Sequence, residues 1–486
     1  MLRLSIFFRN LRSINITRPW VEQNRPVLIR FTGWSIVLLL CLFISRQVAI
    51  GNNLIGFLIA GAFIGLIGLG FLFKYQTLPM ILIVPASFFL AAGINTGTAT
   101  QINAVVLLIF LMIGIWLVDG IVVRREFDFF PSTPILPTVL LLVAVLISFL
   151  FGQLPYFPVE HASIAAQLGA TMIFVLAVGS FFITSQRLTP NALRWFTWLF
   201  LAFAAVYVLA RALIGIAMPV VQLFRPGSVG SLFWVWALAM ISAQLYHNNQ
   251  LKSWTRVFLW MSLALLIYVS VFVAREWTSG WLPPMIALAV LLWISLPNYR
   301  YLIILAGLVV VAIQWNNIVS MVMIGDNEYS MVTRLDAWAI LFKIIKANPV
   351  FGVGPANYYF YTSLFPIRGY YVQFNSHNNY IDLLAQTGIV GTACYIWFII
   401  EMLRLGMKLR GRTSNGFDRA YVYGAIGGIA GTATAGLLGD WVLPFIYNVG
   451  YEGFRSSVFA WMFMGGLISI ERFLALESKD SDPESP

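Results

Sequence analysis

The sequence predicts an all-α polytopic membrane protein with about 12–14 transmembrane helices. Of the 486 residues, 60% are hydrophobic and only 10% are charged, and mean hydropathy is +0.84. The apolar residues form continuous runs, whereas the strands of a transmembrane β-barrel alternate apolar and polar residues. Because a span uses about 20 residues, these runs leave too few residues for a sizeable soluble domain. A cytosolic enzyme with a membrane anchor is therefore excluded.

The apolar runs divide the chain into an arm, a bundle, one long loop and a tail. Residues 1–30 predict a basic cytoplasmic or interfacial arm, 31–317 a transmembrane bundle, and 318–386 a long extracytoplasmic loop. Residues 387–471 add C-terminal transmembrane helices, and the polar segment 472–486 predicts a disordered cytoplasmic tail. The expected spans are 31–50, 54–73, 77–94, 102–118, 135–152, 163–184, 194–214, 229–246, 257–273, 281–296, 301–317, 387–404, 421–444 and 456–471.

The net charge of +11 follows from topology and does not predict nucleic-acid binding. With a cytoplasmic N-terminus, 21 of the 30 Lys and Arg residues lie on the inner side, as the positive-inside rule requires. Nine cations then remain on the outer side, and orientation does not explain them. These are Arg46, Arg211, Arg225, Arg275, Arg334, Lys343, Lys346, Arg368 and Arg455.

The long loop is the expected site region, because ordered loops on rigid scaffolds often carry function. It holds His377, four of the nine outer cations and seven of the 19 tyrosines. Residues 334–347 predict a short amphipathic helix, which Asn348-Pro349 ends. The loop then runs through Gly352 and Gly354, whose lack of a side chain permits close backbone approach.

A second part of the loop leads directly into a predicted span. His377 lies at or near the start of that helix on the outer side. Gly388 and Gly391 lie where the helix enters the bilayer and are expected to allow close packing on a neighbour.

These residues form a recognisable spacing. His377-Asn378, followed by nine residues and then Gly388-x-x-Gly391, resembles the signature of the bacterial O-antigen ligase and polymerase superfamily. The upstream pattern Arg334, Trp338 and Pro349-x-Phe-Gly-Val-Gly354 is similar to the loop that precedes it in that family. Arg275 and the segment Arg225-Pro-Gly resemble two further family positions. The resemblance covers about 225–395, and the first 200 residues match in hydropathy alone.

The resemblance implies a function and a fold. It implies transfer of a glycan from a polyprenyl (undecaprenyl-type) diphosphate donor to a hydroxyl of a lipid, saccharide or protein acceptor. The reaction would occur on the outer face of a bacterial plasma membrane, among membrane lipids. Members of the family resemble the metal-independent, inverting (GT-C-like) glycosyltransferases, which implies that neither a metal nor a cofactor is needed.

This reaction requires positive charge to stabilise the departing diphosphate and a base to remove the proton of the acceptor hydroxyl. Charge that grows on a departing diphosphate can be stabilised by guanidinium groups, which bind phosphate oxygens bidentately. We expect Arg225 and Arg275 to bind the diphosphate and Arg334 to act at the reacting centre. An imidazole, whose ordinary pKa lies near neutral, suits proton removal from the acceptor hydroxyl. His377 is the expected base.

Four tyrosines near these residues have two interpretations. They are Tyr358, Tyr359, Tyr370 and Tyr371, and they form either an interfacial aromatic belt or a platform on which sugar rings stack. Three functions stay open beside the ligase: a repeat-unit polymerase of the same superfamily, a small-anion transporter, and a structural assembly partner. Transport would predict ionisable residues near the middle of the spans, whereas the outer cations cluster at span ends.

Overall fold

The structure, a computed structural model, describes residues 68, 70, 72, 74–90, 93–95, 101–126, 129–275, 277–316 and 331–480. The chain forms two compact units, residues 1–75 and 76–486, and the described helices and strands with labels belong to the second. The predicted arm at 1–30 and the predicted span at 31–50 lie outside the described residues, as does most of the span at 54–73.

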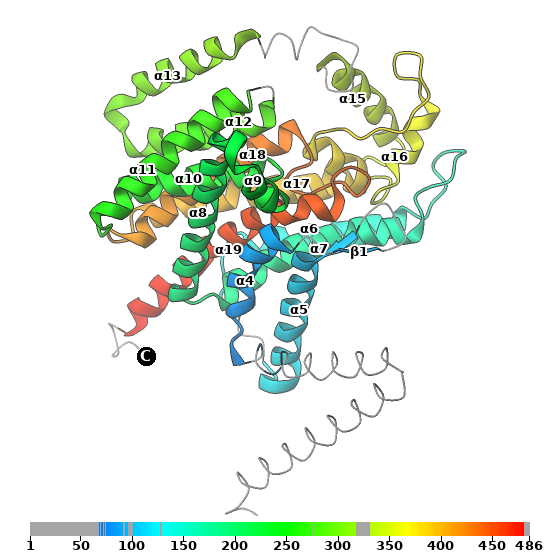
Figure 1. Cartoon of the computed structure of the whole chain (residues 1–486). Helices are drawn as coiled ribbons and strands as arrows, with labels where there is room; N and C mark the ends of the chain where they lie inside the picture. Colours follow the sequence, from blue (N-terminus) through cyan, green and yellow to red (C-terminus); the bar gives the residue numbers. More distant parts are fainter. Residues whose placement is uncertain are drawn as a thin grey trace, which may run out of the picture. The chain divides into compact units, whose positions relative to one another are not determined.

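The described part of the second unit is almost entirely helical (Figure 1). One short hairpin pairs β1 (Gly93–Asn95) antiparallel with β2 (Gln101–Asn103). The α-helices are α4 (Leu78–Phe89), α5 (Ala104–Val118), α6 (Ile135–Phe151), α7 (Ile164–Arg187), α8 (Pro190–Ala212), α9 (Ile214–Ser228), α10 (Ser231–His247), α11 (Ser253–Tyr268), α12 (Thr278–Ser295), α13 (Arg300–Ile313), α15 (Met331–Ile345), α16 (Tyr358–Tyr361), α17 (Asn379–Arg410), α18 (Phe417–Leu438) and α19 (Gly450–Asp480). Short π and 3₁₀ segments are η2 (Asp119–Arg124), η3 (Val269–Val273), η4 (Pro297–Tyr299) and η5 (Thr362–Leu364).

The protein is an all-α polytopic membrane protein, and its described residues contain both full-length and shorter apolar helices. Within the described residues, 8 helices are long and apolar enough to cross a membrane. The count rises to 9 if α9 and α10, which meet at a bend of 97°, form one span. The predicted spans at 77–94, 135–152 and 301–317 correspond to helical segments of only 10–17 residues. Three of the predicted spans therefore form helices shorter than a usual span, and the span predicted at 31–50 and most of the one at 54–73 lie outside the described residues.

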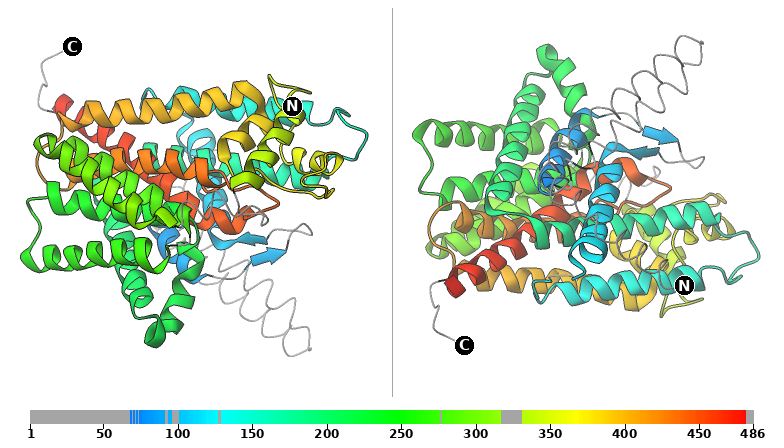
Figure 2. Two further views of the ribbon diagram at one scale, coloured as in Figure 1. Left: turned by 90° about the horizontal axis from the view of Figure 1, so that it is seen from above. Right: turned by 90° about the horizontal axis from the view of Figure 1, so that it is seen from below.

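Small residues let α18 approach three neighbouring helices closely. It packs against α10, α12 and α17, while α19 runs along α7 and α17 runs along α6 (Figures 1 and 2). A Cβ added at Gly427 would lie 2.6 Å from the carbonyl oxygen of Ala287, and one at Gly428 would lie 2.6 Å from the Trp236 ring. Glycines at such crossings allow the tight backbone approach that holds helices together within a membrane.

Polar contacts join different segments at the two ends of the bundle. At one end, Arg187 pairs with Asp119 at 3.0 Å and Lys408 pairs with Glu471 at 2.9 Å. At the opposite end, the segment between α15 and α17 is gathered together (yellow in Figures 1 and 2). There the Asn357 side-chain amide donates to the Gly152 carbonyl at 2.8 Å, which ties this segment to the connection between α6 and α7.

Helix α17 begins at Asn379, directly after the predicted helix start at His377, so about the last two turns' worth of residues in the predicted loop 318–386 are helical. Helix α19 continues to Asp480, so the predicted disordered tail is helical over residues 472–480. In the predicted tail, Arg472 donates hydrogen bonds to the carbonyls of Gln186 and Leu188, which extends the ordered helix past the apolar run.

Candidate functional site

Helix α15 carries the predicted amphipathic pattern and starts slightly earlier than expected. Ala337, Leu341 and Ile344 are buried, whereas Asp336 and Lys343 are exposed. The buried side packs with residues of the α6–α7 connection and of α16 in a small core of its own. Helix α15 is therefore a fixed support for the residues that follow it.

Trp338 on this helix holds the loop that carries His377. Its indole Nε1–H donates to the carbonyl oxygen of Ser376 at 2.9 Å. The backbone of His377 itself has a φ of 48°, a left-handed conformation that a residue with a side chain rarely adopts. Strain of this kind persists where the surroundings hold it in place.

The next residues fix the start of α17. The Asn378 side chain caps the helix by accepting from the backbone N–H groups of Tyr380 at 2.9 Å and Ile381 at 3.3 Å. The Ser376 hydroxyl accepts from the Asn378 N–H at 2.9 Å and lies 2.7 Å from the Asp382 carboxylate. His377 thus lies between two anchored residues directly before a helix, which is where the sequence predicts it.

His377 and Arg334 line the same cavity. Its volume is about 260 Å³, and both residues are half-buried. The Arg334 guanidinium also donates to the carbonyl oxygen of Leu438 at 3.5 Å. The other lining residues are mainly polar or aromatic: Thr333, Ala337, Tyr359, Ile367, Gln373, Phe374, Asn375, Ser376, Tyr447 and Asn448.

Tyr447 and Asn448, in the α18–α19 connection, are lining residues that the motif analysis missed. The Asn448 side-chain amide donates to the Asp440 carboxylate at 2.9 Å, and the backbone N–H of Phe445 donates to the same group at 3.0 Å. Asp440 lies just beyond α18, where burial raises the pKa of its carboxyl group. The spacing of these residues from His377 does not indicate that the segment borders the cavity, and its clearest polar signals in the sequence are Asp440 and Asn448.

Of the four predicted stacking tyrosines, one lines this cavity. Tyr359 does so while its ring stacks on Tyr447 at 4.8 Å. Tyr358 is fully buried, stacks on Phe445 at 4.8 Å and donates its hydroxyl hydrogen to Asp382. The prediction that Tyr358 stacks on a glycan is therefore wrong, because packing has placed its ring in the core. Tyr370 and Tyr371 are 72% and 69% exposed and do not line the cavity.

The motif glycines form one backbone junction. Helix α17 is broken at Gly388, whose φ of 65° and ψ of −167° are not helical. The break frees carbonyls that accept from the N–H groups of Val353 at 2.9 Å and Gly354 at 3.2 Å. It also frees N–H groups that donate to the carbonyls of Pro349 at 2.8 Å and Val350 at 3.2 Å.

Gly352, Gly354 and Gly388 have no room for a side chain, because a Cβ at each would lie at most 2.5 Å from the backbone of a neighbouring segment. A Cβ at Gly352 would lie 2.5 Å from backbone atoms of Gln386, and one at Gly354 would lie 2.4 Å from the Cα of Gly152. At Gly391 the nearest atom, at 2.2 Å, belongs to the Thr387 side chain of the same helix. The predicted close packing on a neighbouring segment therefore applies to Gly388 and not to Gly391.

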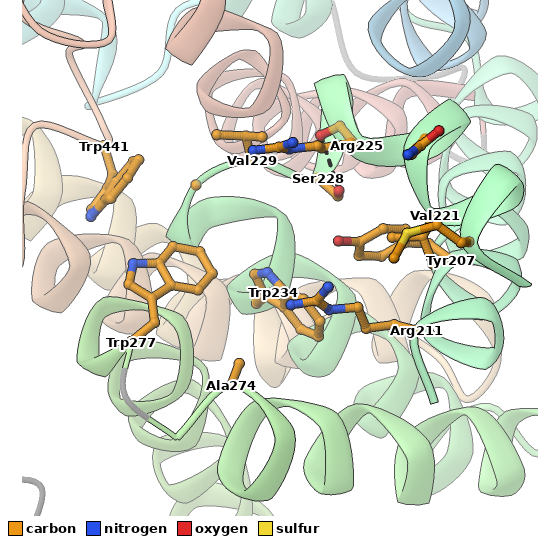
Figure 3. Close-up of a pocket in the computed structure, with 13 residues that line it drawn as sticks. Tyr207, Arg211, Val221, Arg225, Ser228, Val229, Trp234, Ala274, Trp277 and Trp441 are labelled. Atoms are coloured by element: carbon orange, nitrogen blue, oxygen red, sulfur yellow. Dashed lines mark hydrogen bonds between the residues drawn. The ribbon is translucent and has the colours of Figure 1, made fainter. Parts of the chain in front are cut away.

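Arg225 lies in a second and larger cavity of about 600 Å³ (Figure 3). Arg275 is exposed in the turn after η3, and its neighbours Ala274 and Trp277 line this second cavity. Of the two arginines that are expected to bind a diphosphate, Arg225 thus lines the second cavity and Arg275 does not, while Arg334 and His377 line the first.

The connection between α18 and α19 borders both cavities. Tyr447 and Asn448 line the first cavity, and Trp441 lines the second. The Leu438 carbonyl, at the start of this connection, accepts from Arg334 and also from the Ser279 hydroxyl at 3.1 Å. One connection between two helices therefore contributes lining residues to both cavities.

Within the described part of the chain, no group of three or more His, Cys, Asp and Glu side chains could hold a metal ion. The charged groups that line the two cavities are cationic or imidazole side chains. This arrangement provides hydrogen-bond donors and positive charge, which suits phosphate oxygens.

Replacing Trp338 with phenylalanine is expected to slow a reaction that depends on the position of His377, while leaving the fold intact. The substitution removes the hydrogen bond to the Ser376 carbonyl, worth about 1 kcal/mol, and loosens the His377 loop. We expect the turnover rate to fall about 3–10-fold. Trp397→Phe is the matched control, since the Trp397 indole donates to Glu401 at 3.3 Å on the exposed side of α17. Equal rates for the two variants would contradict the supporting role of Trp338.

Comparison with known protein families identifies one domain. Residues 263–396 match the family model described as O-antigen ligase. The matched segment includes Arg275, Arg334, His377, Gly388 and Gly391. No curated protein matches the chain.

Proposed function

The chain belongs, through residues 263–396, to the O-antigen ligase domain family, and from this premise we propose its reaction. The family implies transfer of lipid-linked glycans in surface polysaccharide biosynthesis. The proposed reaction moves a glycan from a polyprenyl diphosphate to an acceptor hydroxyl. The observation that carries the proposal is that Arg334, from α15, and His377, from the loop before α17, line one cavity.

The proposed roles follow from the bonds that change. The acceptor oxygen forms a bond to the anomeric carbon, while the bond from that carbon to the diphosphate oxygen breaks. The hydroxyl proton passes to the imidazole of His377. The departing diphosphate gains negative charge, which Arg334 and the arginines of the second cavity stabilise. Attack opposite the leaving group would invert the configuration of the anomeric carbon.

The two cavities suit different parts of the substrates. The first cavity, with Tyr359 stacked on Tyr447, suits a sugar ring and the acceptor hydroxyl. The second cavity, with Arg225 and its aromatic walls, suits the diphosphate and the apolar carrier. Because the basic residues of the opposite bundle end favour the cytoplasm, the proposal places both cavities on the extracytoplasmic face.

A reconstitution assay tests this proposal. The purified full chain in liposomes would receive an undecaprenyl diphosphate-linked oligosaccharide and a candidate acceptor, and products would be identified by mass spectrometry. Release of undecaprenyl diphosphate with an acceptor-linked glycan supports the ligase. A donor-linked glycan lengthened by one repeat would identify the polymerase of the same superfamily. Uptake of a small anion without any glycan product would overturn the proposal.

We expect a metal chelator to leave transfer unchanged. The positive charge proposed to stabilise the diphosphate comes from guanidinium groups, which a chelator does not remove. The measurement is the initial rate with and without EDTA in the reconstituted assay. Loss of activity that added Mg²⁺ restores would contradict an account based on arginines alone.

A further inference from the structure

The second cavity contains a second arginine that no sequence motif indicates. Arg211 lies near the end of α8 and is half-buried. Its guanidinium and that of Arg225 reach into the same space from two sides (Figure 3). Tyr207, one turn earlier on α8, is almost fully buried and lines the same cavity. The end of α8 is thus part of the cavity wall.

The cavity holds two positive charges without a compensating carboxylate among its described lining residues. Within the described part of the chain, neither Arg211 nor Arg225 forms a salt bridge. Two guanidinium groups that share a partly apolar cavity repel each other unless an anion lies between them. The charge balance therefore favours an anionic ligand.

Further hydrogen-bond donors lie at the bend between α9 and α10. Helix α10 begins after Gly230, which has a φ of 107° and provides no side-chain cap for the first N–H groups. Ser228, Val229 and Gly230 line the cavity, so the positive end of α10 borders it. Trp234 is only 3% exposed, and its indole Nε1–H has no acceptor among the described residues.

The remaining walls are apolar and aromatic. Trp277 and Trp441, in T-shaped contact at 5.9 Å, line the cavity together with Met218 and Val221. Such walls suit the hydrocarbon that adjoins a phosphate ester and not a free inorganic ion. The ligand class that fits is a phosphate or diphosphate ester of an apolar alcohol.

We propose that Arg211 is a further phosphate-binding residue, which together with Arg225 and the amino end of α10 binds the diphosphate of the polyprenyl donor. The proposal rests on the proposed function for the identity of the ligand. In this arrangement each guanidinium binds oxygens from its own side, and the donors at the bend contact the same group. A membrane phospholipid headgroup shares this chemistry and is the alternative source of the anion.

Direct lipid binding tests the proposal without depending on glycan transfer. The purified full chain in detergent would be titrated with undecaprenyl diphosphate and, separately, with phosphatidylglycerol. We expect Arg211→Gln to weaken undecaprenyl diphosphate binding about tenfold or more and to leave phosphatidylglycerol binding unchanged. Arg211→Lys, which keeps the positive charge, should weaken undecaprenyl diphosphate binding less than Arg211→Gln does. Arg194→Gln is the control, because Arg194 lies at the other end of α8, over the Phe417 ring.

The outcomes separate the two proposals. If Arg211→Gln binds undecaprenyl diphosphate as the wild type does while Arg225→Gln does not, the role of Arg211 is overturned and the proposed function stands. If Arg211→Gln weakens only phosphatidylglycerol binding, the cavity holds a phospholipid and the donor assignment is overturned. If the wild type does not bind undecaprenyl diphosphate, both proposals fail.

Discussion

Replacing His377 with alanine is expected to reduce the rate of glycan transfer by about 10²–10⁴, the usual contribution of a positioned general base. His377 is the imidazole that lines the cavity containing Arg334. Without it, the acceptor hydroxyl must lose its proton to water as it attacks the anomeric carbon. Donor binding should be retained, because the arginines that are proposed to bind the diphosphate remain.

The measurement compares single-turnover rates of the wild type and His377→Ala in the reconstituted assay, with size-exclusion profiles to show that both fold. His161→Ala is the matched control, since His161 is a half-buried histidine in the α6–α7 connection that does not line the cavity of His377. A folded His377 variant with full activity would remove the proposed base. Equal loss in the His161 variant would point to a general effect on the protein.

Replacing Gly388 with alanine is expected to destabilise the protein by about 3 kcal/mol or more. Its φ of 65° and ψ of −167° lie in a region that only glycine adopts readily. A Cβ there would also lie 2.2 Å from the backbone oxygen of Val350, which cannot move without breaking the hydrogen bonds of the junction. We expect a large fall in thermal stability and in the yield of monodisperse protein.

Gly369→Ala separates backbone strain from steric clash. Gly369 also has a positive φ, 86°, but a Cβ there would meet no atom within 4 Å. The free energy of unfolding of this variant should therefore fall only by the cost of the left-handed conformation, about 1–2 kcal/mol. Melting temperatures measured in one detergent compare the two variants. If the melting temperatures of both variants fall equally, the clash with Val350 contributes nothing to the destabilisation and the packing explanation is wrong.

Much of the secondary structure could be predicted from hydropathy and periodicity. Continuous apolar runs correspond to helices throughout the described bundle, and the amphipathic pattern of residues 334–347 corresponds to α15. Composition does not tell whether a short apolar helix crosses the bilayer, so hydropathy alone does not separate the three shorter helices from full spans. The extended end of α19 was missed, because its hydrogen bonds run to the distant end of α7.

The motif spacing identified His377, Arg334 and the glycines, whereas it could not identify their partners. Tyr447 and Asn448 border the His377 cavity from a connection about 70 residues further along the chain. Arg211 joins Arg225 only because α8 and the bent pair α9–α10 converge on one cavity. Tyr358 and Tyr359 are adjacent in sequence, yet one is in the core and the other lines the cavity.

The sequence by itself determined the membrane class, the asymmetry of charge and the local spacing of the His377 motif, because these depend on composition and on residues close together in the chain. The tertiary structure decided which side chains share a cavity, since that depends on where distant helices pack. It also explains why the motif contains glycines. The break in α17 at Gly388 exposes backbone groups that hydrogen-bond the loop containing Gly352 and Gly354. No side chain fits between the two segments.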